Sequence, residues 1–218
     1  RAYNANPDAA TATYGLIAGW DVSMITDMSW LFSGLANFNA DFSSWDTSKV
    51  TNMYEMFFNS PAFNQPLSID TSKVTDMDRM FQGARAFNQP LSFDTSEVTD
   101  MRQMFRSADA FNQPLSFDTS EVTDMDRMFQ GAWVFNQPLS FDLSEVTDMR
   151  EMFYGTSLSH ENKLLIRCAW AGNPAFNNVA RHLANSETWP STESCAVLLS
   201  PPSPPPPSPS PPPTPPQP

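Results

Sequence analysis

The chain repeats one pattern of apolar and polar positions every 24 residues. The fifteen letters FNQPLSFDTSEVTDM occur twice in succession, and close variants begin at Phe63 and Phe135. Two degenerate copies precede them, one starting at Phe38 and one at Trp20, so that six units can be counted. A period in this range predicts a solenoid, in which each unit buries its apolar side against its neighbours.

Within one unit the polarity first alternates and then changes period. In PLSFD, Leu91 and Phe93 are expected to point inward and Ser92 outward, as in a half-buried strand. In TDMRQMF, the apolar residues are spaced as on one turn of a helix. One strand, one bend and one short helical turn per unit predict an α/β, leucine-rich-repeat-like solenoid. The leucines at the strand position should form one interior column: Leu67, Leu91, Leu115 and Leu139.

The changes in pattern along the chain divide it into four regions. We expect an N-terminal cap over 1–19, the six-coil solenoid over 20–155, a helical C-terminal cap over 156–200 and a proline-rich tail over 201–218. A solenoid needs a terminal cap to cover its last coil. The predicted C-terminal cap contains two short helices, near Glu161–Ala171 and Pro174–Leu183, separated at an Asn-Pro step.

The repeat unit resembles a known family. The copy FNADFSSWDTSKVTNMYEMF at 38–57 is similar nearly throughout to the BspA-type leucine-rich repeats, and the resemblance covers roughly 20–155. It implies a surface or secreted protein of a bacterium or protist, algae included, with an adhesive or structural role and no catalysis. The four central copies depart from the family pattern because proline replaces a polar residue at the strand edge, which puts a binding role of that edge in doubt.

Two columns of acidic residues recur with the unit. The first consists of Asp21, Asp46, Asp70, Asp94, Asp118 and Asp142, and the second of Asp27, Asn52, Asp76, Asp100, Asp124 and Asp148. Adjacent coils lie roughly 4.8 Å apart, where two carboxylates repel by about 1 kcal/mol in water. We expect Asx turns in the first column and capping of the helical turn in the second, with depressed pKa values in both. The alternative is calcium bound between coils at Asp70, Asp94, Asp118 and Asp142.

Two further residue types recur. The twelve methionines all lie in the repeats, where they are interpreted as core residues under the helical turns, with a thioether metal site or an adaptable binding face as the alternative. One asparagine per central unit is expected to bond the backbone of an adjacent coil through a buried side-chain amide. This asparagine ladder consists of Asn64, Asn88, Asn112 and Asn136, with Asn39 before them.

The only cysteines, Cys168 and Cys195, lie in the predicted C-terminal cap. In a secreted chain, a disulfide between them would pin the segment before the tail onto the helix, and two free buried thiols are the alternative.

The tail holds 13 of the 21 prolines and no charge, so it is expected to form a polyproline II rod. Its Ser and Thr interrupt the prolines as in the hydroxyproline-rich glycoproteins of green-algal and plant walls, which it resembles. That resemblance implies hydroxylation and O-glycosylation, and a naked linker or an SH3-type ligand is the alternative. The candidate positions are Pro202, Ser203, Pro204, Pro205, Pro206, Pro207, Ser208, Pro209, Ser210, Pro211, Pro212, Pro213, Thr214, Pro215 and Pro216.

The net charge and the lack of catalytic motifs in the sequence reduce the number of function classes to consider. The net charge of −12 disfavours nucleic acid as a partner, and no apolar run approaches the length of a membrane span. His160 and His182, the only histidines, have no repeated acid–base partner, so we expect neither an enzyme nor a cofactor. We expect an extracellular structural subunit of a filament, appendage or wall matrix. Its partners would be copies of itself or other extracellular glycoproteins. The alternative is an adhesin that binds glycan or protein through the Ser/Asp strand face.

Overall fold

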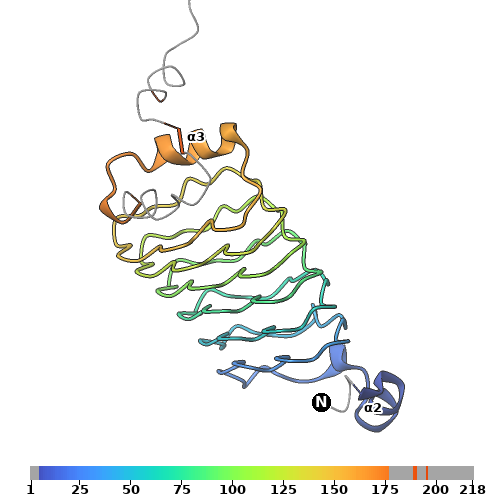
Figure 1. Ribbon diagram of the computed structural model, residues 1–218. Coiled ribbons are helices and arrows are strands. Elements are labelled where there is room, and N and C mark those ends of the chain that lie inside the picture. Colours follow the sequence, from blue (N-terminus) through green and yellow to red (C-terminus); the bar gives the residue numbers. More distant parts are fainter. Residues whose placement is uncertain (1–4, 177–188, 191–194, 196–218) are drawn as a thin grey trace, which may run out of the picture.

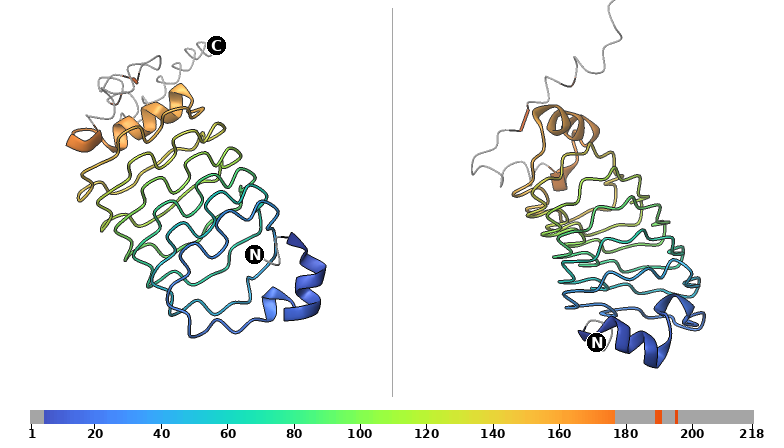
Figure 2. Two further views of the ribbon diagram at one scale, coloured as in Figure 1. Left: turned by 60° about the horizontal axis from the view of Figure 1, so that its bottom comes forward. Right: turned by 90° about the vertical axis from the view of Figure 1, so that its right-hand side faces the viewer.

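The computed structural model describes residues 5–176, 189–190 and 195. From the first repeat onward the chain winds in successive coils that stack along one axis (Figure 1). The helical elements are the α-helix α2 (Pro7–Tyr14), the short 3-10 helix η1 (Ile17–Gly19) and the α-helix α3 (His160–Ala169). Figure 2 shows α2 at one end of the stack and α3 lying across the other.

The predicted α/β class is wrong. No residue within the described ranges belongs to a strand of a sheet. The coils meet instead through isolated parallel bridges that join Asp27, Asn52, Asp76, Asp100, Asp124 and Asp148 in succession. The segment PLSFD has the alternating polarity of a strand. Its contact with the next coil is made just after it by a side chain: the Thr95 hydroxyl donates to the Asp118 carbonyl at 2.7 Å.

The predicted helical turn is also wrong. The N–H groups of Met101, Gln103 and Phe105 donate to carbonyls of the next coil, whereas those of Met104 and Arg106 donate to the carbonyl three residues earlier in their own coil. Gln103 has a φ of 52°, in the left-handed region, which no α-helix tolerates. The segment is therefore a pair of linked tight turns. Helical spacing of apolar residues did not distinguish the two, since both arrangements bury the same side chains.

Each coil turns at two left-handed positions. The first is occupied by Trp30, Glu55, Arg79, Gln103, Arg127 and Glu151, and the second by Gly34, Asn59, Gly83, Ser107, Gly131 and Gly155. Glycine at the second position avoids the steric cost of a Cβ in this conformation. At Gly83 a Cβ would also press against the Asn59 side chain of the preceding coil. Because every coil turns at the same points, the coils superimpose and their side chains stack.

Stacked aromatic rings form the core. Phe81, Phe105 and Phe129 stack with centroids 5.6 and 5.5 Å apart, and neighbouring phenylalanine columns repeat this geometry. The predicted inward register holds at Leu91 and Phe93, which are buried while Ser92 is exposed. The leucine column is buried except at Leu115, which is half-buried. The paired methionines are buried as core residues, although the extra Met24 is 74% exposed.

The last coil is closed by the helical segment that follows it. The Ser159 side chain caps α3 by accepting from Asn162 N–H at 3.1 Å, and Ile166 and Trp170 pack inward. Trp170 stacks against Phe153 of the last coil with centroids 6.0 Å apart. The predicted helix over Glu161–Ala171 thus corresponds to α3, whereas most of the second predicted helix lies outside the described residues.

The last coil also differs in sequence where it meets this segment. In four earlier coils a threonine hydroxyl donates to a carbonyl of the next coil, from Thr47, Thr71, Thr95 and Thr119. Leu143 takes that position in the last coil. Its carbonyl accepts from Asn173 Nδ2 at 2.9 Å, and the Phe141 carbonyl accepts from Trp170 Nε1 at 3.0 Å.

Candidate functional site

The first aspartate column is a row of exposed Asx turns. Oδ1 of Asp118 accepts from the N–H of Ser120 at 3.0 Å and from its hydroxyl at 2.8 Å. These two bonds hold the pKa of Asp118 below its usual value. The corresponding serine donors also lower the pKa of Asp21, Asp46, Asp70 and Asp142. Each of these carboxylates is thus stabilised in its charged form by its own coil.

The second column makes a similar turn in a less polar environment. Oδ1 of Asp76 accepts from Asp78 N–H, and Oδ1 of Asp124 accepts from Asp126 N–H, both at 2.9 Å. Burial nevertheless raises the pKa of Asp76 and Asp124, and these backbone bonds only partly oppose it. At Asp148, burial is outweighed by hydrogen bonds from Arg150, which leave its pKa lowered. The expectation of depressed pKa values in both columns is therefore wrong at Asp76 and Asp124.

Two residues after this column, the coils carry alternating acids and bases that pair between coils. Asp78 lies between two guanidiniums, with its Oδ2 at 3.1 Å from both Arg79 Nη1 and Arg102 Nη2. Its side chain is 1% exposed, and its Oδ1 has no hydrogen-bond partner in the described structure. Burial raises the pKa of Asp78 to about 6 against the opposing effect of both arginines.

The same arrangement recurs two coils later. Asp126 Oδ2 lies 2.8 Å from Arg127 Nη1, and Asp126 Oδ1 lies 3.9 Å from Arg150 Nε. Burial raises the pKa of Asp126 as it does that of Asp78. Glu151 adds an ion pair to Arg127 at 3.0 Å. We call this set of ion pairs the charged face. Some of its pairs join neighbouring residues of one coil, and each of its arginines also contacts an acid of an adjacent coil.

The asparagine ladder holds adjacent coils together, with half-buried side chains where buried ones were expected. Oδ1 of Asn39, Asn64, Asn88 and Asn112 each accepts from the backbone N–H of the asparagine one coil on, at 2.9–3.0 Å. Asn136 ends the series by accepting from Ser159 N–H at 2.8 Å, just before α3. A glutamine joins each step, as where Gln113 Nε2 donates to the Asn88 carbonyl at 3.1 Å. These amides bond the scaffold itself.

An exposed aromatic edge lies on the last two coils. Trp133 is 62% exposed and Tyr154 is 57% exposed. The Trp133 ring reaches the next coil, with its Cζ3 3.7 Å from where a Cβ of Gly155 would be. Val134, which follows Trp133, is also exposed. We call Trp133, Val134 and Tyr154 the aromatic edge. Sequence reasoning missed it, although GAWVFNQ departs visibly from the GARAFNQ and SADAFNQ of earlier units.

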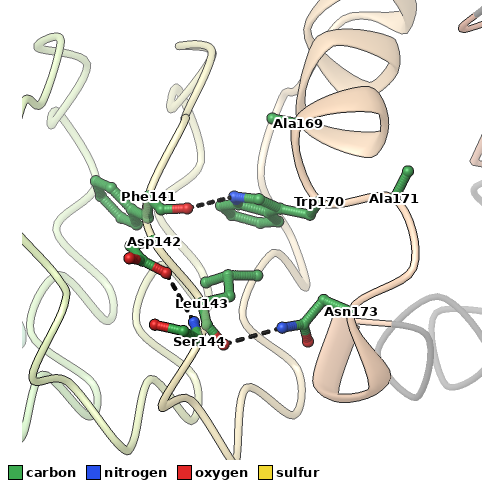
Figure 3. Close-up of a pocket in the computed structure, with 8 residues that line it drawn as sticks. All are labelled: Phe141, Asp142, Leu143, Ser144, Ala169, Trp170, Ala171 and Asn173. Atoms are coloured by element: carbon green, nitrogen blue, oxygen red, sulfur yellow. Dashed lines mark hydrogen bonds between the residues drawn. The ribbon is translucent and has the colours of Figure 1, made fainter.

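A small pocket lies where α3 meets the last coil (Figure 3). It is lined by Phe141, Asp142, Leu143, Ser144, Ala169, Trp170, Ala171 and Asn173 and measures about 230 Å³. Sites for small molecules usually measure about 300–1,000 Å³. Figure 3 shows the polar groups of Trp170 and Asn173 turned toward the backbone of the last coil, where they donate hydrogen bonds. The pocket is therefore a feature of the closure and offers no acid–base pair.

The cysteines are joined in a disulfide, with their Cα atoms 5.4 Å apart. This bond fastens Cys195 to the last turns of α3. The tail that follows, with all of its hydroxylation and glycosylation candidates, lies outside the described residues.

The described structure gives the calcium alternative no support. Within 5–176, 189–190 and 195, no three Asp, Glu, His or Cys side chains are grouped so that they could hold a metal ion. Asp70, Asp118 and their column neighbours bond their own serines instead. Separately, no helix in the described part of the chain is long and apolar enough to cross a membrane.

One family model matches the chain over residues 4–93 and 91–166, which together cover most of it. That family is described as "Mycoplasma protein of unknown function, DUF285". The chain belongs to the DUF285 family. Membership supports the resemblance to BspA-type repeat surface proteins and is compatible with an extracellular protein. No curated protein and no solved structure matches this DUF285 chain.

Proposed function

We propose that the chain is a non-catalytic, extracellular structural subunit of a filament, a surface appendage or a wall matrix. The repeat body would act as a stiff scaffold. The tail, with hydroxylated prolines and O-glycans, would serve assembly with copies of the chain or with other extracellular glycoproteins.

One observation carries the proposal: several sets of recurring polar side chains bond an adjacent coil or their own turn. The asparagine ladder, the threonine hydroxyls and the arginines of the charged face all bond an adjacent coil. A side chain that must reach a substrate has to keep a donor, acceptor or titratable group available for it. The donors, acceptors and charged groups of these three sets are thus engaged by the scaffold, which supports a structural role.

A recognition role is the second candidate, and the aromatic edge favours it. Exposed Trp and Tyr are enriched where proteins bind partners, since they supply large contact area at low entropy cost. This evidence differs from the expected Ser/Asp strand face, because Asp118 and its column neighbours are engaged by their own serines.

Deleting residues 201–218 in the native source separates the two candidates. A structural subunit that assembles through its tail should lose its higher-order assembly, seen by electron microscopy of surface material, while the secreted amount and melting temperature of the body stay unchanged. Intact-mass spectrometry of the undeleted protein reports hydroxylation, glycans and the disulfide in the same preparation. Unchanged assembly after the deletion would reject the assembly role of the tail and favour recognition.

A further inference from the structure

We propose that the aromatic edge is a docking site for a polyproline II segment, and that its occupant is the proline-rich tail of the same chain. This goes beyond the proposed function, since the tail can dock on its own body whether or not the protein forms a filament.

The first argument is the chemistry of the edge. Trp133 and Tyr154 are both more than half exposed, and they are carried by adjacent coils of a rigid stack. Pre-formed polyproline II segments bind surfaces lined by such aromatic rings, because proline rings pack on the aromatic faces and little backbone freedom remains to be lost. Residues 201–218 contain 13 prolines and no charge. An uncharged aromatic surface suits this segment better than a charged one.

The second argument is the place where the edge occurs. One and two coils before Trp133 the equivalent residues are Asp109 and Arg85, which pair with each other at 3.7 Å. The residues equivalent to Tyr154 are Gln130 and Arg106. The repeat thus exchanges polar and charged residues for aromatic ones in its last two coils. These are the coils nearest the end from which the tail departs.

The third argument is reach. Trp189, twelve residues before the start of the tail, packs against Phe153 with centroids 5.7 Å apart, and Phe153 is the chain neighbour of Tyr154. At the other side of the edge, the Ser157 hydroxyl bonds the Trp133 carbonyl. Cys195 is fixed to Cys168 in α3, and a helix of ten residues is only about 15 Å long. The five residues 196–200 extend to about 17 Å, a span comparable with the length of α3.

Reach also decides between the chain's own tail and that of a second copy. A short tether gives a linked segment an effective concentration of about 1 mM. Unlinked copies in micromolar solution compete poorly with that. The tail would therefore lie along its own last coils, which gives the rod a fixed direction relative to the body.

The test uses the full chain, disulfide intact, with 5-fluorotryptophan in place of its six tryptophans. Fluorine NMR of this protein is compared with a full-length variant in which all tail prolines are replaced by serine, which preserves length and neutrality. The Trp133 resonance, assigned by its loss in Trp133→Arg, should shift between the two. The resonance of Trp30, which is 57% exposed in the first coil, is the internal control and should stay in place.

A second test, by small-angle X-ray scattering, does not depend on the fluorine label. The double variant Trp133→Arg and Tyr154→Gln carries residues that this chain itself uses at the equivalent places, so its melting temperature should remain that of the parent. Its maximum dimension in small-angle X-ray scattering should increase, because the freed rod is about 55 Å long. An unmoved Trp133 resonance together with an unchanged dimension would overturn the proposal. A shift that appears only as concentration and molecular mass rise would identify a second copy's tail and also overturn it.

Discussion

The two aspartate columns have nearly the same 24-residue spacing and the same two-residue turn, yet Asp76 and Asp124 of the second column have raised pKa values where the first column has lowered ones. Asp118 of the first column is exposed, accepts two bonds from Ser120 and has a lowered pKa. Asp76 of the second column accepts one bond, is partly buried and has a raised pKa. Local turn geometry is therefore insufficient to set the charge state. Two further factors decide it: how much water the rest of the coil leaves around the carboxylate and, at Asp148, the hydrogen bonds from Arg150.

The largest effect is expected from removing an arginine beside the buried acid of the charged face. Arg102→Ala leaves Asp78 with one guanidinium partner instead of two, and should cost about 1–3 kcal/mol of unfolding free energy at pH 7. At pH 5 the cost should shrink, because Asp78 then takes up a proton. Urea unfolding at both pH values measures this.

The matched control is Arg85→Ala, which also removes an inter-coil Arg–Asp pair, 24 residues apart in sequence but with both side chains exposed. It should change stability by about 0.5 kcal/mol or less at either pH. Equal costs for the two arginine variants would show that burial does not separate the charged face from ordinary surface pairs.

The second prediction concerns the pH profile of stability. Asp78 has a pKa of about 6 in the folded state, above its unfolded value, so the folded protein binds more protons in this range. Stability should therefore rise as the pH falls from about 7 to about 4, by on the order of 2 kcal/mol for this group alone. Burial raises the pKa of Asp126 too, which adds in the same direction. Melting temperatures recorded between pH 4 and pH 8 measure the trend.

Below about pH 4 the first column should reverse that trend. Its lowered pKa values mean that the folded carboxylates lose their serine bonds only when they are protonated. The combined profile should have a maximum in mildly acidic solution, and in Asp78→Asn the rise toward that maximum should be smaller. A profile that falls steadily from pH 7 downward would contradict the raised values.

A smaller effect is expected from the exposed column. Asp118→Ala removes the acceptor of the Ser120 bonds but leaves the backbone and the core in place. It should lower the melting temperature less than Arg102→Ala does. Its cost should disappear in strong acid, where the parent carboxylate is protonated as well. Thermal melts of the parent and of both variants at pH 7 and at about pH 2 provide the comparison.

The smallest effect is expected from metal removal. If the turns and not calcium hold the first column, a chelator should leave the melting temperature unchanged, and added calcium should not raise it. A loss of stability on chelation would show that the exposed carboxylates share an ion, and the contrast between the columns would then have to include that ion.

The sequence predicted much of the packing and less of the backbone. Alternation in PLSFD identified Leu91 as buried and Ser92 as exposed, because side-chain polarity reports on burial directly. It did not identify a strand, because the contact with the next coil is made at Thr95 by a hydroxyl. The spacing of Met101, Met104 and Phe105 predicted a buried set correctly and a helix wrongly. A left-handed residue such as Gln103 leaves no signal in its own identity.

Features of the site that depend on recurring residues could be predicted from the sequence, whereas those that depend on the surroundings of a single residue could not. The asparagine ladder and the serine bonds of the first column follow from columns visible in the sequence. The raised pKa of Asp78 depends on how deeply the coils bury its carboxyl group, and the repeat pattern of the sequence does not report that burial. The aromatic edge was visible only as a departure from the repeat, at Trp133 and Tyr154.

In the last coil, Leu143 stands where four earlier coils carry a threonine, and this difference marks the end of the repeat. Each of these threonine hydroxyls donates to a carbonyl of the next coil. A unit that carries threonine can therefore be followed by a further copy of itself. The Leu143 side chain has no hydroxyl to donate, and the Leu143 carbonyl accepts a hydrogen bond from Asn173, which lies outside the repeat. Gene duplication among the central units would therefore lengthen the protein by whole coils without redesign. The number of central coils would then change, while Trp170 and Asn173 would still close the coil that carries Leu143.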